Sequence, residues 1–207
     1  MMPFHFSIRT ALRQSWHVVI THAWFFITLS VINLILNVVD RSSSNPIITV
    51  LVVIAAIVWS YVGFSVSLAA VDGKHDQLNI KSLQQHLPTF RNVLKLVAVG
   101  IVVGLITLLG FVALIIPGIY FMIRLSFSNL AYVDHKGGIM EAVRFSWHIV
   151  TTKVFWTVFA TIAVMIGLMI AGAIVFFVGL FIAYPVAMIL QAKLYRALSE
   201  YHSATQG

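Results

Sequence analysis

The sequence predicts an all-α integral membrane protein, a bundle of six transmembrane helices in three hairpins with amphipathic interfacial helices on the cytoplasmic side. Of its 207 residues, 60% are hydrophobic and only 9% are charged, whereas a soluble domain carries about 25% charged residues. Several apolar runs are long enough to cross a hydrocarbon core of about 30 Å. This composition excludes both an ordinary water-soluble domain and a disordered chain.

Residues 1–207 form a single transmembrane domain in this interpretation. The apolar runs 93–133 and 154–191 are each too long for one crossing, so each should fold back. In the first run the break falls between Gly110 and Gly118, where Pro117 with Gly118 is the strongest turn signal, although proline can also only kink a membrane helix. The predicted elements are interfacial helices at 4–20, 77–88 and 138–150, and spans at about 23–39, 47–70, 93–113, 118–133, 154–177 and 180–198. Four crossings remain an alternative if one long run is re-entrant.

The basic residues predict the orientation. Lys and Arg total 13 against 6 Asp and Glu, and with six crossings nearly all of these cations fall on the side that holds both termini. The opposite side receives only Arg41, next to Asp40. The positive-inside rule therefore places both termini in the cytoplasm. The expected partners are membrane lipids, including anionic ones, and no nucleic acid, because no basic stripe with interleaved aromatic residues occurs. A protein partner or a homo-oligomer stays open.

An internal repeat links the two ends of the chain. Residues 8–21 match residues 139–152 at a constant offset, and both segments lead into a span that opens with aromatic residues. Both copies enter the membrane from the same side, which predicts parallel repeats related by an axis along the membrane normal. Segment 80–90 is a candidate third copy, although its residues do not match. The repeated motif consists of Ser15, Trp16 and His17 in the first copy and Ser146, Trp147 and His148 in the second.

The repeated segments are amphipathic, which is typical of helices that lie in the lipid headgroup layer. Such helices insert aromatic and aliphatic side chains and turn basic residues toward water and lipid phosphates. Arg13 and Arg144 occupy equivalent basic positions in the two copies. We therefore treat both arginines as candidate contacts for anions or lipids.

A longer block of the sequence resembles a known membrane domain. Residues 115–127, IIPGIYFMIRLSF, followed by residues 141–147, EAVRFSW, are similar to the six-helix membrane domain attached to bacterial glycerophosphoryl diester phosphodiesterases. They are also similar to stand-alone families of uncharacterised bacterial inner-membrane proteins. The resemblance implies a multipass protein of the bacterial cytoplasmic (inner) membrane, and it does not carry over the hydrolase activity, because no soluble phosphodiesterase domain or acidic metal cluster remains.

Arg124 is the most informative single position. It is predicted to lie within the hydrocarbon, where a charge costs about 2.5–3.5 kcal/mol and should face the bundle or a water-filled cavity. One interpretation is an anion or lipid-phosphate contact, since guanidinium binds phosphate through two donors. A structural tie between helices, to backbone carbonyls or to Asn33, Asn37 or Ser126, is the alternative, and snorkelling to the cytoplasmic interface is a third.

The sequence does not predict an enzyme. It contains no nucleophile elbow, no Walker loop and no paired-carboxylate motif, and we expect no catalytic residue, metal or cofactor. The first functional hypothesis is a membrane protein that interacts with or organises lipids or partner proteins through its cytoplasmic helices. The alternative is a small transporter or lipid-translocating protein that uses Arg124 in a polar intramembrane cavity.

Overall fold

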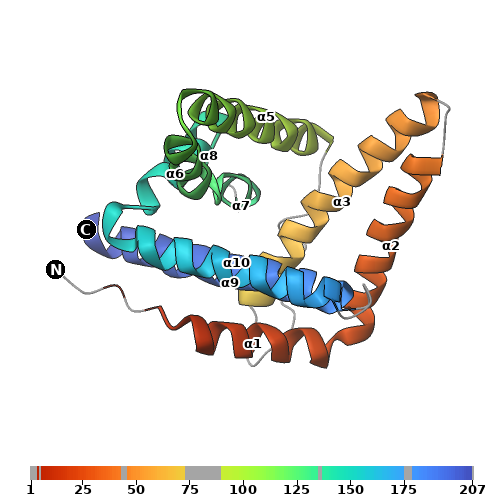
Figure 1. Ribbon diagram of the computed structural model, residues 1–207, viewed down its shortest axis with the longest axis horizontal. Helices are drawn as coiled ribbons and strands as arrows, with labels where there is room; N and C mark the ends of the chain where they lie inside the picture. The colour runs from red at the N-terminus through yellow and green to blue at the C-terminus, as the bar shows by residue number, and fades with distance from the viewer. Residues whose placement is uncertain are drawn as a thin grey trace.

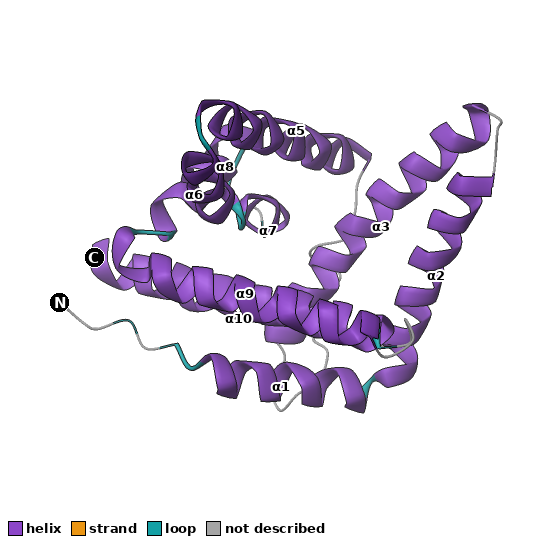
Figure 2. Cartoon of the chain, viewed as in Figure 1, coloured by secondary structure: helices purple, strands orange, loops and turns teal. Residues whose placement is uncertain are grey.

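The computed structural model describes residues 4, 6–42, 46–72, 90–134, 137–174 and 179–206. Regular structure within these ranges is α-helical throughout, which confirms the all-α class (Figure 2). The helices are α1 (Ile8–Thr21), α2 (Ala23–Ser42), α3 (Pro46–Asp72), α5 (Phe90–Ala113), α6 (Ile115–Leu125), α7 (Ser128–Val133), α8 (Ile139–Ile149), α9 (Thr152–Ile174) and α10 (Leu180–Gln206). The predicted interfacial helix 77–88, and with it nearly all of the candidate third repeat copy, lies outside the described residues.

Three of these helices are long and apolar enough to cross a membrane. They are Ile47–Asp72 in α3, Arg91–Ala113 in α5 and Thr152–Ile174 in α9. Only 6% to 17% of the most apolar window of each helix is buried inside the protein. A water-soluble monomer rarely leaves so much contiguous apolar surface uncovered. This surface is therefore suited to contact with lipid.

The helices pair into the hairpins α2–α3, α5–α6 and α9–α10. In Figure 1, α2 and α3 stand out to the right, α9 and α10 lie along the long axis, and α5 lies above them. α1 turns into α2 through a bend of 87° and packs along α10, whereas α8 packs on α7 and α5. Each described amphipathic helix thus packs on a hairpin other than the one it leads into.

The buried core lies where α3, α7, α8 and α10 meet, at the α1 and α8 end of the hairpins. Its largest fully buried side chains include Tyr61, Phe127, Leu130, Tyr195 and Leu198. A smaller cluster joins α1 and α2 to α3 and α10. Toward the hairpin tips, by contrast, large apolar side chains such as those of Ile47, Val112 and Ile174 are exposed.

The middle hairpin turns at Leu114, whose φ of −169° and ψ of 153° are extended. Pro117 follows in the first turn of α6, where a missing N–H removes no helical hydrogen bond. The Gly118 N–H donates to the Leu114 carbonyl at 3.2 Å. The chain therefore reverses just ahead of Pro117, and proline starts the return helix without kinking a longer one.

The predicted continuous span 118–133 is instead divided into α6 and α7. α6 has 11 residues, which cover about 16 Å at 1.5 Å per residue. The Ser126 hydroxyl donates to the Ile123 carbonyl at 2.8 Å, a local bond that competes with the helical ladder. The side-chain amide of Gln191 in α10 donates to the Ser126 carbonyl at 3.0 Å. Tertiary contacts thus satisfy the backbone groups that the break releases.

Glycines allow the closest approach between helices at two hairpin tips. A Cβ atom on Gly118 would lie 2.5 Å from the Phe111 ring, and one on Gly110 would lie 3.0 Å from the Gly118 Cα. At the α9–α10 tip, a Cβ on Gly179 would lie 2.6 Å from the Gly172 carbonyl oxygen. By contrast, open space surrounds the Cβ position of three other helical glycines, Gly100, Gly104 and Gly167.

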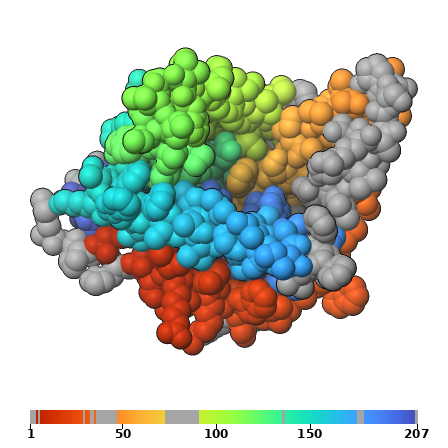
Figure 3. Space-filling model, in the orientation of Figure 1, coloured from red at the N-terminus to blue at the C-terminus, as the bar shows by residue number. Residues whose placement is uncertain are grey.

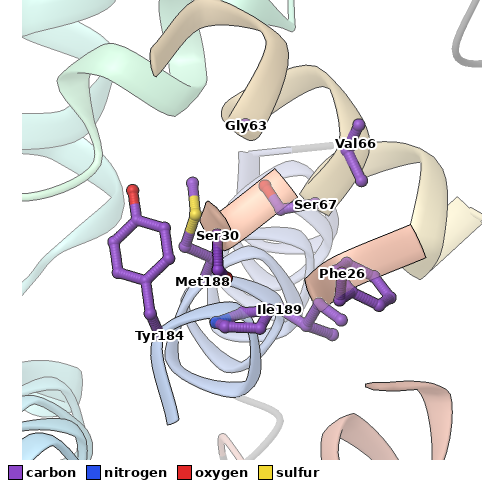
Figure 4. Close-up of a pocket in the computed structure, with 9 residues that line it drawn as sticks. Phe26, Ser30, Gly63, Val66, Ser67, Tyr184, Met188 and Ile189 are labelled. Carbon is purple, nitrogen blue, oxygen red and sulfur yellow. The ribbon is translucent and has the colours of Figure 1, made fainter. Parts of the chain in front are cut away.

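α10 contains Pro185, which leaves one backbone carbonyl of the helix without a donor, and another helix supplies a donor for that carbonyl. Pro185 has no N–H for the carbonyl of Phe181, one turn earlier. The Ser30 hydroxyl of α2 donates to that carbonyl at 3.2 Å. Ser30 lines a small pocket of about 20 Å³ between α2, α3 and α10, in which Phe26 and Met188 supply apolar walls (Figure 4). A side chain thus replaces the backbone donor that proline lacks.

This pairing predicts coupled effects of two substitutions. S30A should destabilise the protein by about 0.6–1.5 kcal/mol, the usual range for a hydrogen bond between membrane helices. In a P185A background the new N–H can pair with the Phe181 carbonyl, so S30A should then cost close to nothing. Thermal unfolding of the four proteins in detergent measures this coupling. T28A is the matched control, because Thr28 donates to the carbonyl of Trp24 in its own helix. Equal costs of S30A in both backgrounds would contradict the assignment.

Candidate functional site

The second copy of the repeat forms α8, and its two faces differ sharply. The helix begins after Gly138, whose N–H donates to the Glu141 carboxylate at 2.9 Å. Arg144 and His148 are exposed. The buried face consists of Ala142, Val143, Ser146 and Ile149. α8 is therefore anchored by its apolar face and presents its basic face outward, as an interfacial helix does.

Arg124 lies at the end of α6 and is held by α8. Its Nε donates to the Val150 carbonyl at 2.8 Å. The guanidinium carbon lies 4.2 Å from the centre of the Trp147 ring and 5.3 Å from that of Tyr120. Cation–π contacts of this kind are worth about 0.5–2 kcal/mol each. The contacts with Asn33 and Asn37 that the sequence suggested fall on side chains outside the described residues, and the structural role observed is a tie to the α8–α9 junction.

Ser146 of the repeat motif binds the break between α6 and α7. Its hydroxyl donates to the Arg124 carbonyl at 2.8 Å and accepts from the Phe127 N–H at 3.2 Å. The side chain is fully buried. Two backbone groups that the break leaves without helical partners are therefore satisfied by one hydroxyl. Ser146 thus holds the backbone at the end of α6, and Trp147 packs against the Arg124 side chain of the same helix.

The first copy of the motif, in α1, is arranged differently. Ser15 is fully buried but donates to the Ala11 carbonyl of its own helix at 2.8 Å. Trp16 is 46% exposed and Ile20 is 48% exposed. Arg9, Arg13 and His17 are also exposed. The outer face of α1 therefore combines apolar and basic side chains, and in Figure 3 this helix forms one edge of the molecule.

A charged cluster joins the ends of all three hairpins. Arg196 of α10 makes a two-point contact with Asp72 at the end of α3, with distances of 2.9 and 2.8 Å. It also contacts Asp134, just after α7, at 2.8 Å. The Tyr195 hydroxyl donates to the other oxygen of Asp134 at 2.9 Å. Two carboxylates, one guanidinium and one phenol thus form a network that fixes the three hairpins to one another.

The sequence predictions do not include this cluster, although the sequence carries a signal for it. The pattern Leu-Ala-x-Val-Asp-x-Lys occurs at 68–74 and again at 130–136. The spacing along the sequence from Asp72 to Asp134 is the same as that from Asp134 to Arg196. The three charges therefore occupy corresponding positions in successive hairpins, a regularity that the comparison of residues 8–21 with 139–152 does not reveal.

α8 also contacts α10 through a histidine. His202 packs edge-on against the Phe145 ring, with 6.0 Å between the ring centres. Burial lowers the pKa of His202 below its ordinary value, and the charge of His148 lowers it further. The folded protein therefore resists protonation of His202 more strongly than the unfolded chain does.

This difference predicts how stability depends on pH. The unfolded chain titrates near pH 6.5 and binds more protons than the folded protein just below it, so stability should be highest above about pH 6.5 and fall as the pH drops through it. In H202Q, stability should fall less than in the wild type over the same decrease in pH. Unfolding temperatures in detergent between about pH 7.5 and about pH 5.5 measure the slope. A slope that is the same in H202Q and in the wild type would contradict the prediction.

The predicted site residues fall into two separate groups. Arg124, Ser146 and Trp147 lie together at the α6–α8 junction, with Arg144 and His148 exposed on the same helix α8. Ser15, Trp16, His17 and Arg13 belong to α1, which packs on α10. Pro117 and Gly118 belong to the middle hairpin tip. Comparisons with protein-family models, with curated proteins and with solved structures find no match to this chain.

Proposed function

We propose that the chain is a six-crossing protein of the bacterial inner membrane that associates with anionic lipids and organises them through the exposed surfaces of α1 and α8. The crossings are α2, α3, α5, α6 with α7, α9 and α10. Three of them meet the length and hydropathy requirement alone. Support for the others comes from pairing, since α2 packs against α3 and α10 against α9. A helix that pairs in a hairpin with a crossing helix returns the chain through the same layer.

The outer face of α1 is the observation that carries this function. Trp16 and Ile20 are exposed on the same helix as Arg9 and Arg13. Aromatic and aliphatic side chains beside cations suit the boundary between headgroups and acyl chains. The sharp bend between α1 and α2 directs α1 along α10, where Phe4 lies against Tyr201 and Gln14 against Lys193. The basic residues of α1 therefore lie beside the C-terminal part of α10. Since the basic residues lie on the α1 and α8 side, the positive-inside rule supports a cytoplasmic location for this side and both termini.

The contacts of Arg124 favour this function over translocation. Its Nε is bound to the Val150 carbonyl and its guanidinium carbon lies over the Trp147 ring. Val150 leads from α8 into α9, so the charge is held where an interfacial helix meets a crossing helix rather than midway along the hairpin. That position corresponds to the snorkelling arrangement. A transport path needs a polar group that can exchange partners, and these contacts fix the arginine.

Lipid selectivity in reconstituted membranes tests the proposal. With spin-labelled phosphatidylglycerol and phosphatidylcholine, the wild type should hold the anionic lipid preferentially. The double substitution R9Q/R13Q should reduce that preference by up to about 1 kcal/mol per arginine, the value of a basic residue near an anionic surface. R9K/R13K keeps both charges and is the matched control. An unchanged preference in R9Q/R13Q at low ionic strength would contradict the proposed function.

A further inference from the structure

We infer that Arg124 is a binding site for the phosphate group of a membrane lipid on the α8 side. This inference rests on the proposed function and names the group that one residue recognises. Only one of the three guanidinium nitrogens has a protein partner, because the Nε donates to Val150 and no other acceptor for Arg124 occurs in the described part of the chain. The two η nitrogens are therefore free to bind a ligand.

These η nitrogens are also accessible. Among the described residues, the buried side-chain atoms without a hydrogen-bond partner are the hydroxyls of Tyr61 and Ser128 and the amide oxygen of Asn129. The two η nitrogens of Arg124 are not in that group although they have no partner, so they keep contact with the surroundings of the protein. The half-buried arginine thus has a fixed inner edge and an open outer edge.

The aromatic contacts present that open edge in one orientation. Trp147 lies 4.2 Å and Tyr120 lies 5.3 Å from the guanidinium carbon, measured to the ring centres, and Phe155 packs on Tyr120 in turn, with 5.4 Å between rings. A guanidinium that packs against two aromatic rings and is bound through Nε can still offer two parallel N–H donors. Two such donors match the oxygens of a phosphate group.

The surroundings of the site favour an anion at headgroup depth. Tyr120 and Phe121, one turn before Arg124 on the same face of α6, are half-buried, so this face is not sealed inside the protein. The acidic side chains closest in sequence are engaged elsewhere, Asp134 with Arg196 and Glu141 with Gly138. The repeat-related Trp16 is exposed instead of covered by an arginine. The site is thus a property of the second repeat copy, and α1 supplies a general basic surface.

The decisive experiment compares a lipid that carries a phosphate group with a lipid that carries none, on the full-length protein in bilayers. Spin-labelled phosphatidylglycerol carries a phosphate, whereas spin-labelled diacylglycerol does not. R124K keeps the positive charge but removes the paired donors. We expect R124K to lose about tenfold of the preference for phosphatidylglycerol over diacylglycerol, the loss of a charge-assisted pair of hydrogen bonds. R91K, at the exposed start of α5 and outside α1 and α8, should leave this ratio unchanged.

Separate outcomes distinguish this inference from the proposed function. If R9Q/R13Q lowers binding of phosphatidylglycerol while R124K leaves its ratio to diacylglycerol unchanged, the phosphate site is refuted and the proposed function stands. If inorganic phosphate displaces phosphatidylglycerol from the wild type in an R124-dependent way, the site belongs to a free anion and the lipid assignment is overturned. Should R124K fail to fold, W147F serves instead. It keeps an aromatic ring while weakening the stack, and it should reduce the same ratio, whereas an unchanged ratio would refute the inference.

Discussion

Replacing Arg196 by glutamine should destabilise the folded protein by about 3 kcal/mol, the cost of leaving buried charges without their partner. The reason lies in the geometry of the charged cluster. The Asp134 side chain is 7% exposed, and those of Arg196 and Asp72 are 23% and 27% exposed. Without the guanidinium, two carboxylates would face each other across a poorly solvated junction, and the ends of α3 and α7 would lose their link to α10.

Unfolding in detergent, followed by circular dichroism, measures this cost. K193Q is the matched control, because Lys193 lies on the same helix and contacts the neutral side chain of Gln14, and we expect it to cost less than about 1 kcal/mol. Adding D134N to R196Q removes one of the stranded charges and should recover part of the loss. A cost for R196Q no larger than that for K193Q would show that the network contributes little to stability.

Substitution of Gly179 by alanine should cost about 2–3 kcal/mol, at the upper end of the range for overpacking. A Cβ atom at this position would lie 2.6 Å from the carbonyl oxygen and 2.7 Å from the Cα of Gly172. Both obstacles are backbone atoms, so no side chain can rotate away, and the tip of the α9–α10 hairpin would have to open. The unfolding temperature in detergent should fall accordingly.

Two further alanine substitutions make this prediction specific. G167A on α9 adds a methyl group where nothing lies within 4 Å, and it should be neutral or stabilising by up to about 1 kcal/mol through helix propensity. G118A meets the ring of Phe111 instead of backbone, so F111A should rescue it. Similar effects of G179A and G167A would show that the contact between Gly172 and Gly179 does not restrict the hairpin.

Sequence patterns were most informative where the physics is local. Helical class follows from long apolar runs with few charges, and the reversal ahead of Pro117 follows from turn chemistry between Gly110 and Gly118. The division of span 118–133 could not be predicted in this way. Its carbonyls at Arg124 and Ser126 are satisfied by Ser146 and Gln191, which come from helices distant in sequence.

The two tryptophans of the repeat show the same limit. Trp16 and Trp147 occupy identical places in nearly identical motifs, yet one is exposed and the other stacks on Arg124. The difference arises from the neighbouring helix, since α1 packs on α10 and α8 packs on the middle hairpin. A motif therefore predicts a helix and its amphipathic character, whereas its burial depends on a partner that the motif does not contain.

The packing of α1 on α10 joins two segments that are far apart along the chain. The ring of Phe4 also lies 5.2 Å from that of Tyr201, so the contact extends ahead of α1. During synthesis α1 is made before α10, and its apolar face stays without this partner until α10 follows. A nascent chain halted before α10 should therefore leave that face open to chemical cross-linking, and the reactivity should disappear once α10 has been made.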